Sequence, residues 1–568
     1  MAQATRATRV TPAVAKMTGT KTLSWQIILL SILLFFPGYL ASKYLKLENE
    51  IAYGIGISVS LSILLGLLLG FVGLFHWFIF WPILLIITGV LWWKVRPELE
   101  WSYDWKQTTS LFLTVLFVFS TFYFERAEDR YPQHFDEFRD IAIAKTVIEQ
   151  GRIVPLVSNT EFERTNHDGF YRNLQFGFHI LLAELGISGF DLILDYRYFP
   201  AIFSLFVLSG IFVFIYTITG SVWATLPAML LYSVMKTNII LLGPGLFVPI
   251  ILAFGFILLF FNSFIKFYQG SKVHFFLTLL FSFMLVLIHP PSITFAIPVI
   301  ALFVLAYPRL LKKNYKYLLI YQGIGLLGAL AATMVFWDKG GIGFVLGNLV
   351  FDNRWAAIQD LRYSLLELAV IPIYVFALLG AIFCIRKKSY LPIAWMAGCL
   401  SLYFLYHELN WTLFSPYQRL LLYLTLSIFI CAAIGMYATT KLISQRKYVL
   451  GFWVVLIIIP TVIYQDFLED KPRLQYVQTL MDDDYYTAII WADENLGYDN
   501  VVVIDHPKAW SFNAVSRNEV SERQLEYSFG GSNIMIFTCI EKADVTITKK
   551  NCPKKKVHQV NDVKIYVN

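Results

Sequence analysis

Repeated apolar runs constrain this chain more than any other feature of its sequence. A helix that crosses a bilayer needs about 20 apolar residues, and fewer where neighbouring helices cover it. Candidate spans occupy 24–43, 51–73, 77–93, 108–124, 198–217, 222–235, 246–267, 275–289, 291–306, 317–337, 364–385, 390–407, 418–438 and 448–465. We therefore predict an α-helical polytopic membrane protein with about 14 transmembrane segments.

The composition excludes the main alternatives to a membrane protein. Hydrophobic residues make up 57% of the 568 and charged residues 15%, against about 45–50% and about 25% in soluble domains. These values exclude a soluble globular enzyme, a disordered chain and a fibrous one. The net charge of +7 is attributed to basic cytoplasmic loops, so we predict membrane lipids, and not nucleic acid, as partners. Residues 1–21 are basic and precede an apolar run without a small-residue cleavage site, which predicts a retained anchor.

Three polar blocks, 125–197, 338–363 and 466–568, interrupt the apolar runs. Lys and Arg concentrate in the cytoplasmic loops of membrane proteins. Placing the basic turns of this chain inside puts all three blocks and the segment 407–417 outside, in a multi-pass protein of the plasma membrane. The segment 24–43 conflicts with this arrangement, because its basic flank then lies outside. It is either a re-entrant half-helix broken at Pro37 or an exception to the rule.

The last polar block has the pattern of a small extracytoplasmic α/β domain. A helix is predicted around 485–491, and strands are predicted at 500–505, 534–537, 545–548 and 563–567. Cys539 and Cys552 either form a disulfide in this block or stay as two thiols. Further upstream, 174–187 is too short to cross a bilayer and is predicted to be an amphipathic helix at the membrane interface.

An acidic pair, Asp136-Glu137, follows a predicted span and lies in a block dense in charges. One carboxylate of such a pair can act as a general base, while its neighbour or Arg139 sets its pKa. The alternative is a solvated helix face, which is the commoner role of adjacent acidic residues. The position beside the membrane, among aromatic residues, favours a functional role for the pair.

Four features in sequence order resemble the GT-C glycosyltransferases, large multi-spanning enzymes that use lipid-linked sugars. The features are the acidic pair Asp136-Glu137, a helix with Ala142, Ala144 and Gly151, an apolar helix with Gly177 to Ala183, and Arg197 opening the next span. Protein O-mannosyltransferases and the lipid A aminoarabinose transferase are members. The resemblance covers 108–465 in architecture and 125–200 in motif, and it leaves 1–107 as an N-terminal tail with an added transmembrane module.

The resemblance implies a transfer reaction at the outer face of the membrane. In the family, an outer-loop Asp deprotonates an acceptor hydroxyl, whose oxygen attacks the anomeric carbon of a sugar held on a polyprenyl phosphate. The lipid phosphate then leaves. This implies Asp136 as the base, with Glu137 as its partner or substitute. The acceptor is a protein, a lipid or a glycan.

A leaving phosphate requires cations at the membrane surface. Arg419 is the best candidate because it opens an apolar span, although an interfacial anchor would look the same. Arg354 and His289 are further candidates for the donor phosphate. The candidates for substrate binding are His167, Asp168, Arg172, Tyr417 and His407.

Two other classes of function remain as alternatives: a transporter or flippase of lipid-linked sugars, and a non-catalytic assembly subunit. Transporters place ionisable residues near the bilayer centre and often show inverted repeats. Here ionisable residues cluster at span ends and no repeat is visible, which favours the transferase. The sequence holds no P-loop or dinucleotide fingerprint. A divalent metal is left open as a cofactor, without a ligand set to identify it.

Overall fold

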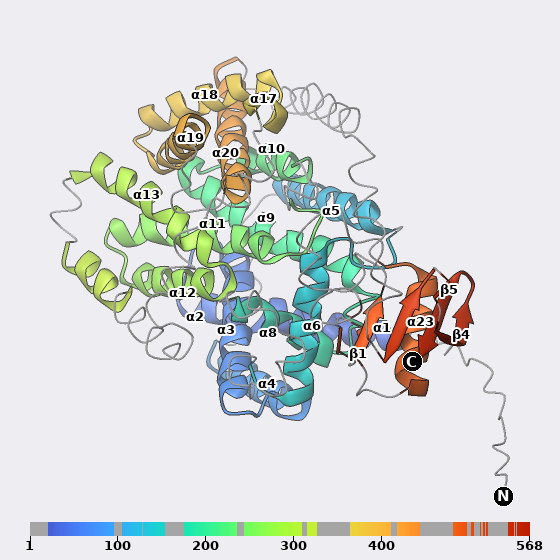
Figure 1. Cartoon of the computed structure of the whole chain (residues 1–568). Coiled ribbons are helices and arrows are strands. Elements are labelled where there is room, and N and C mark those ends of the chain that lie inside the picture. The colour runs from blue at the N-terminus through green and yellow to red at the C-terminus, as the bar shows by residue number, and fades with distance from the viewer. Residues whose placement is uncertain are drawn as a thin grey trace, which may run out of the picture.

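The computed structural model describes most of the chain. The described residues are 21–95, 105–127, 129–153, 175–235, 243–308, 315–325, 364–409, 417–443, 481–496, 501–504, 512, 515–516, 519–520, 544–549, 551–552 and 554–567. Within these residues the protein is a helical bundle with a small sheet at one edge, as Figure 1 shows.

The helices follow in this order along the chain, and all but the last belong to the bundle. They are α1 (Lys21–Leu34), α2 (Phe36–Tyr44), α3 (Glu50–Phe71), α4 (Trp77–Val95), α5 (Trp105–Ala127), α6 (Phe135–Gln150), α8 (Phe176–Ile187), η3 (Tyr196–Tyr198), α9 (Phe199–Thr219), α10 (Val222–Ser233), α11 (Pro249–Tyr268), α12 (Lys272–Ile288), α13 (Pro290–Ala306), α17 (Leu365–Leu368), α18 (Ile371–Arg386), α19 (Leu391–Leu409), α20 (Tyr417–Ile443) and α23 (Asp483–Leu496). Residues 315–325 form a further helical segment.

Seven helical stretches of the described residues are long and apolar enough to cross a membrane: 25–44, 50–71, 77–95, 105–126, 196–219, 249–268 and 417–441. Shorter apolar helices accompany them, among them α10, α12, α13 and α18. The protein is therefore an α-helical multi-pass membrane protein, while the number of 14 spans stays a prediction. In the stretch 25–44 the helix breaks at Phe35, two residues before Pro37.

The helices alternate in direction, which gives the bundle two ends. Tight turns join α9 to α10, α11 to α12, α12 to α13, and α18 to α19. Helices α5, α10, α12 and α19 finish at the end where α6 begins, which we call the Asp136 end. Helices α9, α11, α13 and α18 finish at the opposite end, which we call the Lys266 end. The basic residues used to orient the sequence, such as Lys266 and Lys388, lie at the Lys266 end.

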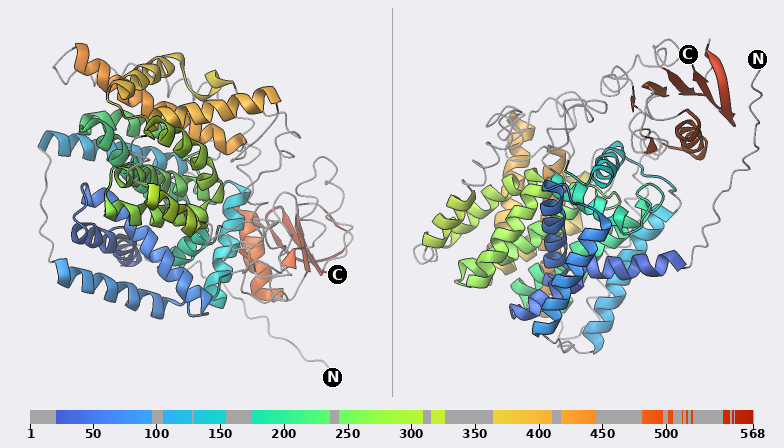
Figure 2. Two further views of the ribbon diagram at one scale, coloured as in Figure 1. Left: turned by 90° about the vertical axis from the view of Figure 1, so that its left-hand side faces the viewer. Right: turned by 90° about the horizontal axis from the view of Figure 1, so that it is seen from below.

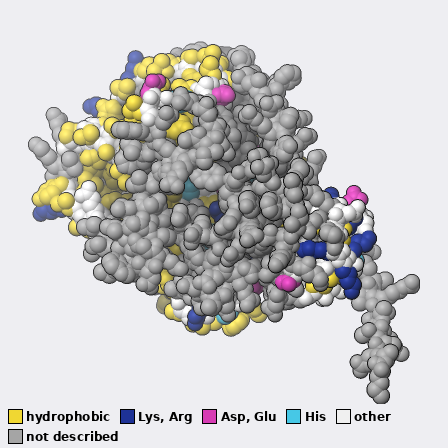
Figure 3. Space-filling view, viewed as in Figure 1, with side chains coloured by type: hydrophobic (Ala, Val, Ile, Leu, Met, Phe, Trp, Pro, Cys, Tyr) yellow, Lys and Arg dark blue, Asp and Glu magenta, His cyan; other side chains and the backbone are white. Residues whose placement is uncertain are grey.

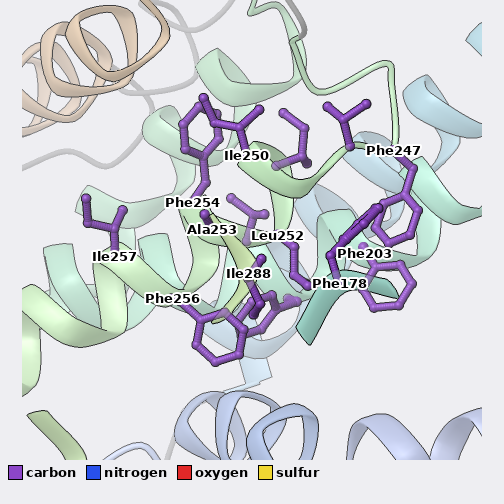
Figure 4. Close-up of a cluster of buried hydrophobic side chains, with 14 of the residues drawn as sticks. Phe178, Phe203, Phe247, Ile250, Leu252, Ala253, Phe254, Phe256, Ile257 and Ile288 are labelled. Atoms are coloured by element: carbon purple, nitrogen blue, oxygen red, sulfur yellow. The ribbon is translucent and has the colours of Figure 1, made fainter. Parts of the chain in front are cut away.

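Helix α11 lies at the centre of the packing, where its residues from Pro249 to Phe264 are buried without interruption. It packs against α9 and α12. Figure 4 shows the aromatic side chains at the start of this helix, where the Phe203 and Phe247 rings stack with centroids 4.4 Å apart. Phe178 of α8 joins them, 5.1 Å from Phe247. A helix that is apolar on all sides in this way is a core helix, covered by protein on every face.

Helix α8 does not lie at an interface, so the prediction of an amphipathic surface helix for 174–187 is wrong. Its residues Gly177 to Leu185 are all buried, including the polar side chains of His179 and Glu184. It packs against α3, α6 and α12. Protein therefore covers both polar side chains of this helix.

Helices α18 and α20 cross in close contact through two glycines. A Cβ on Gly380 would lie 1.8 Å from the carbonyl oxygen of Cys431, and one on Gly435 would lie 1.9 Å from that of Phe376. Such distances leave room for hydrogen only. Small residues at helix crossings let backbones approach and gain van der Waals contact, which is the main source of helix association in lipid.

The C-terminal part forms a five-stranded sheet in the order β2-β1-β3-β5-β4. The strands are β1 (Val501–Ile504), β2 (Glu519–Val520), β3 (Val545–Thr548), β4 (Lys555–Val560) and β5 (Val563–Val567). Strand β1 pairs in parallel with β2 and β3, and β5 pairs antiparallel with β3 and β4. Helix α23 packs on this sheet. The predicted strands at 500–505, 545–548 and 563–567 are thus present, whereas 534–537 lies outside the described residues.

The cysteines fall into two groups. Cys384, Cys399 and Cys431 are free and buried among the helices. Cys552, between β3 and β4, is disulfide-bonded, and Cys539 lies outside the described residues.

The sheet region contacts the bundle next to the start of α6. Both views in Figure 2 show it at one edge of the bundle beside this helix. Tyr131, in the loop between α5 and α6, donates a hydrogen bond to Asp483 of α23 over 2.6 Å. Arg130 forms an ion pair with the same carboxylate at 2.8 Å, and the Tyr131 ring lies 5.3 Å from the ring of Tyr486. The last part of the chain is therefore attached to the loop that leads into α6.

Candidate functional site

Glu137 holds the first turn of α6 in place. Its Oε2 accepts hydrogen bonds from the backbone N–H groups of Gln133 and His134, at 2.8 and 3.1 Å. Its Oε1 accepts one from the backbone N–H of Phe247, at 3.1 Å. Arg126 of α5 completes the set at 3.4 Å. The carboxylate is fully buried and its acceptor sites are occupied, so Glu137 joins α5, α6 and the start of α11.

His134 is the N-cap residue of the same helix. Its Nδ1 accepts a hydrogen bond from the backbone N–H of Asp136 at 3.1 Å. Burial lowers the pKa of His134, and the nearby negative charges of Asp136 and Glu137 only partly offset this effect. A neutral imidazole is also what the bond requires, because a protonated Nδ1 could not accept it.

Asp136 is the less buried carboxylate of the pair. Its side chain is 13% exposed, and Arg139, one turn further along α6, approaches it to 3.0 Å. Burial would raise the pKa of Asp136, but the positive charges around it, of which Arg139 is the strongest, lower the pKa below its ordinary value. Asp136 is therefore ionised at neutral pH and able to accept a proton.

A second acidic group, Asp140, forms an ion pair with Arg139. Its Oδ1 accepts hydrogen bonds from Arg139 at 3.2 Å and from His179 of α8 at 3.1 Å. Asp140 is completely buried, and its Oδ2 has no hydrogen-bond partner among the described residues. The guanidinium of Arg139 is thus held between two carboxylates, which fixes the cation that lowers the pKa of Asp136.

Arg419 lies at the start of α20 and supplies a second positive charge to the same region. It acts electrostatically on both Asp136 and His134. Among the described residues, it makes no hydrogen bond and no ion pair. A partly buried guanidinium that makes no hydrogen bond or ion pair to the described part of the chain can bind an anion.

His289 lies between α12 and α13 at the same end of the bundle, and the charge of Arg419 also acts on it. Its Nδ1 is hydrogen-bonded to the Ser292 hydroxyl at 2.8 Å. That hydroxyl in turn bonds the hydroxyl of Tyr423, one turn after Arg419 on α20. His289 is buried and is linked to the helix that carries Arg419.

His407 and Tyr417 form a pair at the junction of α19 and α20. The His407 Nε2 and the Tyr417 hydroxyl are 2.9 Å apart. The Tyr417 ring also stacks on Tyr406, with centroids 3.9 Å apart. A cavity of about 380 Å³ lies beside this cluster, lined by residues of α17 and α19 including His407. Both side chains flank the region of Arg419, two residues after Tyr417.

The other site residues predicted from the sequence, Arg354, His167, Asp168 and Arg172, lie outside the described residues. The structure brings together the remaining six, which are Asp136, Glu137, His289, His407, Tyr417 and Arg419, at one end of the bundle. Sequence reasoning missed Asp140, His179 and Arg126. The spacing of Asp136, Arg139 and Asp140 on one helical face could have indicated Asp140, but nothing local to the sequence points to His179.

Among the residues that the structure describes, no three His, Cys, Asp or Glu side chains are grouped in a way that could hold a metal ion. In comparisons with known proteins, no family model matches the chain and no curated protein matches it.

Proposed function

We propose that the protein is a glycosyltransferase that moves a sugar from a polyprenyl-phosphate donor to an acceptor hydroxyl, with Asp136 as the general base. One observation carries this proposal. Arg419 acts electrostatically on Asp136, and it makes no hydrogen bond or ion pair to any residue that the structure describes. An ionised carboxylate and an available guanidinium in one region suit a reaction that takes a proton from one oxygen and releases negative charge on another.

In the proposed step, the carboxylate of Asp136 takes the proton of the acceptor hydroxyl. The acceptor oxygen forms a bond to the anomeric carbon as the bond from that carbon to the phosphate oxygen breaks. The electron pair of the broken bond stays on the lipid phosphate, and Arg419 stabilises its charge. A single displacement of this kind inverts the configuration at the anomeric carbon.

The two acidic neighbours have different roles in this proposal. Glu137 already accepts hydrogen bonds from three backbone N–H groups and from Arg126. It is a positioning residue, because its carboxylate is used to hold the first turn of α6. Asp136 carries the proton transfer, since it is the partly exposed one.

The Asp136 end is proposed to face the outside of the plasma membrane. The basic residues at the ends of α11 and α18 lie at the opposite end, as the positive-inside rule requires of cytoplasmic loops. The disulfide at Cys552 supports the same orientation, because disulfides persist in oxidising compartments. The hydrogen bond from Tyr131 to α23 supports a position of the C-terminal sheet on the same side as Asp136.

The test is Asp136→Asn, with Glu149→Gln on the same helix as the matched control. Membranes that contain the purified protein are supplied with polyprenyl-phosphate sugars, and the release of polyprenyl phosphate is measured by mass spectrometry. We expect Asp136→Asn to lose about 10²–10⁴-fold in rate, the usual contribution of a general base, and Glu149→Gln to keep its rate. Both variants should elute as monodisperse protein.

Two results would favour the alternatives. Wild-type turnover by Asp136→Asn would refute the role of Asp136 as the general base, and the absence of any polyprenyl phosphate release from the wild-type protein would favour an assembly subunit. Movement of the labelled donor across the bilayer, without any release of polyprenyl phosphate, would identify a flippase instead.

A further inference from the structure

A second cavity, of about 460 Å³, lies at the Lys266 end of the bundle, away from the site at Asp136. The ends of α9, α11 and α13, the turn between α18 and α19, and Glu48 from the loop after α2 surround it. The proposed transfer reaction does not use this cavity. Its walls combine two lysines, several tyrosines and the small polar residues Thr217 and Ser389.

Two cations converge on this cavity from different helices. Lys266 lies near the end of α11, with its side chain 14% exposed, and pairs with Glu48, whose side chain is 77% exposed. Lys388 follows α18 and is exposed; among the described residues it forms no ion pair. Because Arg386 and Lys387 are also exposed beside it, the mouth of the cavity carries a net positive charge.

The backbone at Lys388 is an independent sign of a constrained position. Its φ is +56°, in the left-handed region where glycine is the usual residue after a helix. A side chain at such a position strains the backbone. Within the cavity, the Thr217 hydroxyl is buried and has no hydrogen-bond partner among the described residues. A phosphate ester would supply the negative charge that Lys388 lacks, and the acceptor oxygen that the Thr217 hydroxyl lacks, among the described residues.

The outer surface beside the cavity is apolar. Leu305 of α13 and Ile385 of α18 are 74% and 53% exposed, one helical turn or less from the lining residues Phe303 and Lys388. Figure 3 shows hydrophobic patches over α13 and α18, with Lys and Arg side chains next to them. A ligand with a charged head and apolar chains fits this combination better than a free ion does.

We propose that this cavity binds the phosphorylated headgroup of an anionic phospholipid, held by Lys266 and Lys388, with its acyl chains along α13 and α18. Basic pockets between transmembrane helices at the cytoplasmic side are typical sites for such headgroups. The bound lipid joins the ends of α9, α11, α13 and α18. It therefore stabilises the fold at the end opposite the site.

The test measures the melting temperature of the full-length protein in neutral detergent while dioctanoyl phosphatidylglycerol is added. Parallel titrations use dioctanoyl phosphatidylcholine and inorganic phosphate. We expect a saturable rise with phosphatidylglycerol only. An equal rise with inorganic phosphate would overturn the lipid assignment and make the cavity a site for a soluble anion, and an equal rise with phosphatidylcholine would overturn the role of charge.

Two kinds of variant locate the effect. Lys388→Gln should need about fivefold more phosphatidylglycerol for half of the maximal rise, given about 1 kcal/mol for each lysine near a lipid surface. Ser389→Trp keeps both charges but fills the cavity, and should remove the saturable rise. Lys441→Gln, near the end of α20 and outside the cavity lining, is the matched control and should respond like the wild type. A wild-type response from both Lys388→Gln and Ser389→Trp would refute the proposal, even if the transfer activity is established.

Discussion

Glu137→Gln tests whether the acidic pair divides its roles as the structure indicates. The substitution keeps the size of the side chain but replaces one oxygen by an NH₂ group, which cannot accept a hydrogen bond. In the amide orientation of lowest free energy, the remaining oxygen keeps its hydrogen bonds with the N–H groups of Gln133 and His134 and with Arg126. The NH₂ group then faces the backbone N–H of Phe247, which now bonds Oε1 at 3.1 Å.

The expected loss of stability follows from those contacts. One buried N–H group left without an acceptor costs about 1–3 kcal/mol. The contact with Arg126, itself only 2% exposed, changes from an ion pair to a hydrogen bond in which only the donor is charged, which removes about 1 kcal/mol more. Together these losses amount to about 2–4 kcal/mol. Asp136 keeps its charge and its neighbour Arg139, so its ability to accept a proton should survive wherever the protein stays folded.

The assay compares Glu137→Gln with Asp136→Asn in two measurements on the same purified material. Thermal unfolding in detergent, followed by size-exclusion chromatography, should show a large loss of stability for Glu137→Gln and a small change for Asp136→Asn. The release of polyprenyl phosphate, measured well below the melting temperature, should show the opposite order. A stable Glu137→Gln protein without turnover, alongside an active Asp136→Asn protein, would refute the assignment of roles.

Three further predictions concern other contacts. Arg139→Gln removes the strongest positive charge beside Asp136, so the pKa of that carboxyl rises, and the acid limb of the kcat/KM profile should move to higher pH; an unchanged limb would contradict the role of Arg139. Tyr131→Phe removes the hydrogen bond to Asp483, worth about 1.5–3 kcal/mol with a charged acceptor, so hydrogen exchange should rise in 129–134 and α23 together but not in α11. Gly435→Ala should reduce the yield of monodisperse protein sharply because of the α18–α20 contact, while Gly398→Ala, whose new Cβ would find its nearest neighbour at 3.5 Å, should be tolerated.

The sequence predicts the helices correctly wherever the length of an apolar run alone determines the secondary structure. The long runs at 51–73, 198–217 and 246–267 correspond to α3, α9 and α11, since a continuous apolar run in lipid must form a helix to satisfy its backbone. The β1, β3 and β5 strands were equally visible, because short Val-rich and Ile-rich runs favour buried strands. Their arrangement in one sheet was not visible, because strand order depends on contacts between distant residues.

The misreading of 174–187 shows where local pattern fails. His179 and Glu184 interrupt this short apolar run, which favours a helix at the interface, but a single chain segment does not reveal what covers it. In the structure, Asp140 lies 3.1 Å from His179. A Cβ on Gly66 of α3 would lie 2.6 Å from the Glu184 carboxylate, so this glycine makes room for it. The partner of His179 and the space for Glu184 are thus both provided by residues far away in the sequence.

The candidate site was predictable in part. The positive-inside rule placed the acidic pair and the start of α20 on one face, and in the structure Arg419 acts on Asp136. The division between Asp136 and Glu137 was not predictable, because it depends on the N–H of Phe247, 110 positions away. The same is true of the link from His289 through Ser292 to Tyr423, which joins two helices that no local pattern connects.

The hydrogen bond from Tyr131 to Asp483 has a consequence for biosynthesis, because it joins residues 352 positions apart. A ribosome adds about 5–20 residues per second, so roughly 20–70 s pass between the synthesis of the two partners. During that interval the bundle helices are already entering the bilayer, while the loop ahead of α6 still lacks its last anchor. A chain that stalls or is truncated before α23 therefore lacks this hydrogen bond, and its loop ahead of α6 has one fewer contact to hold it.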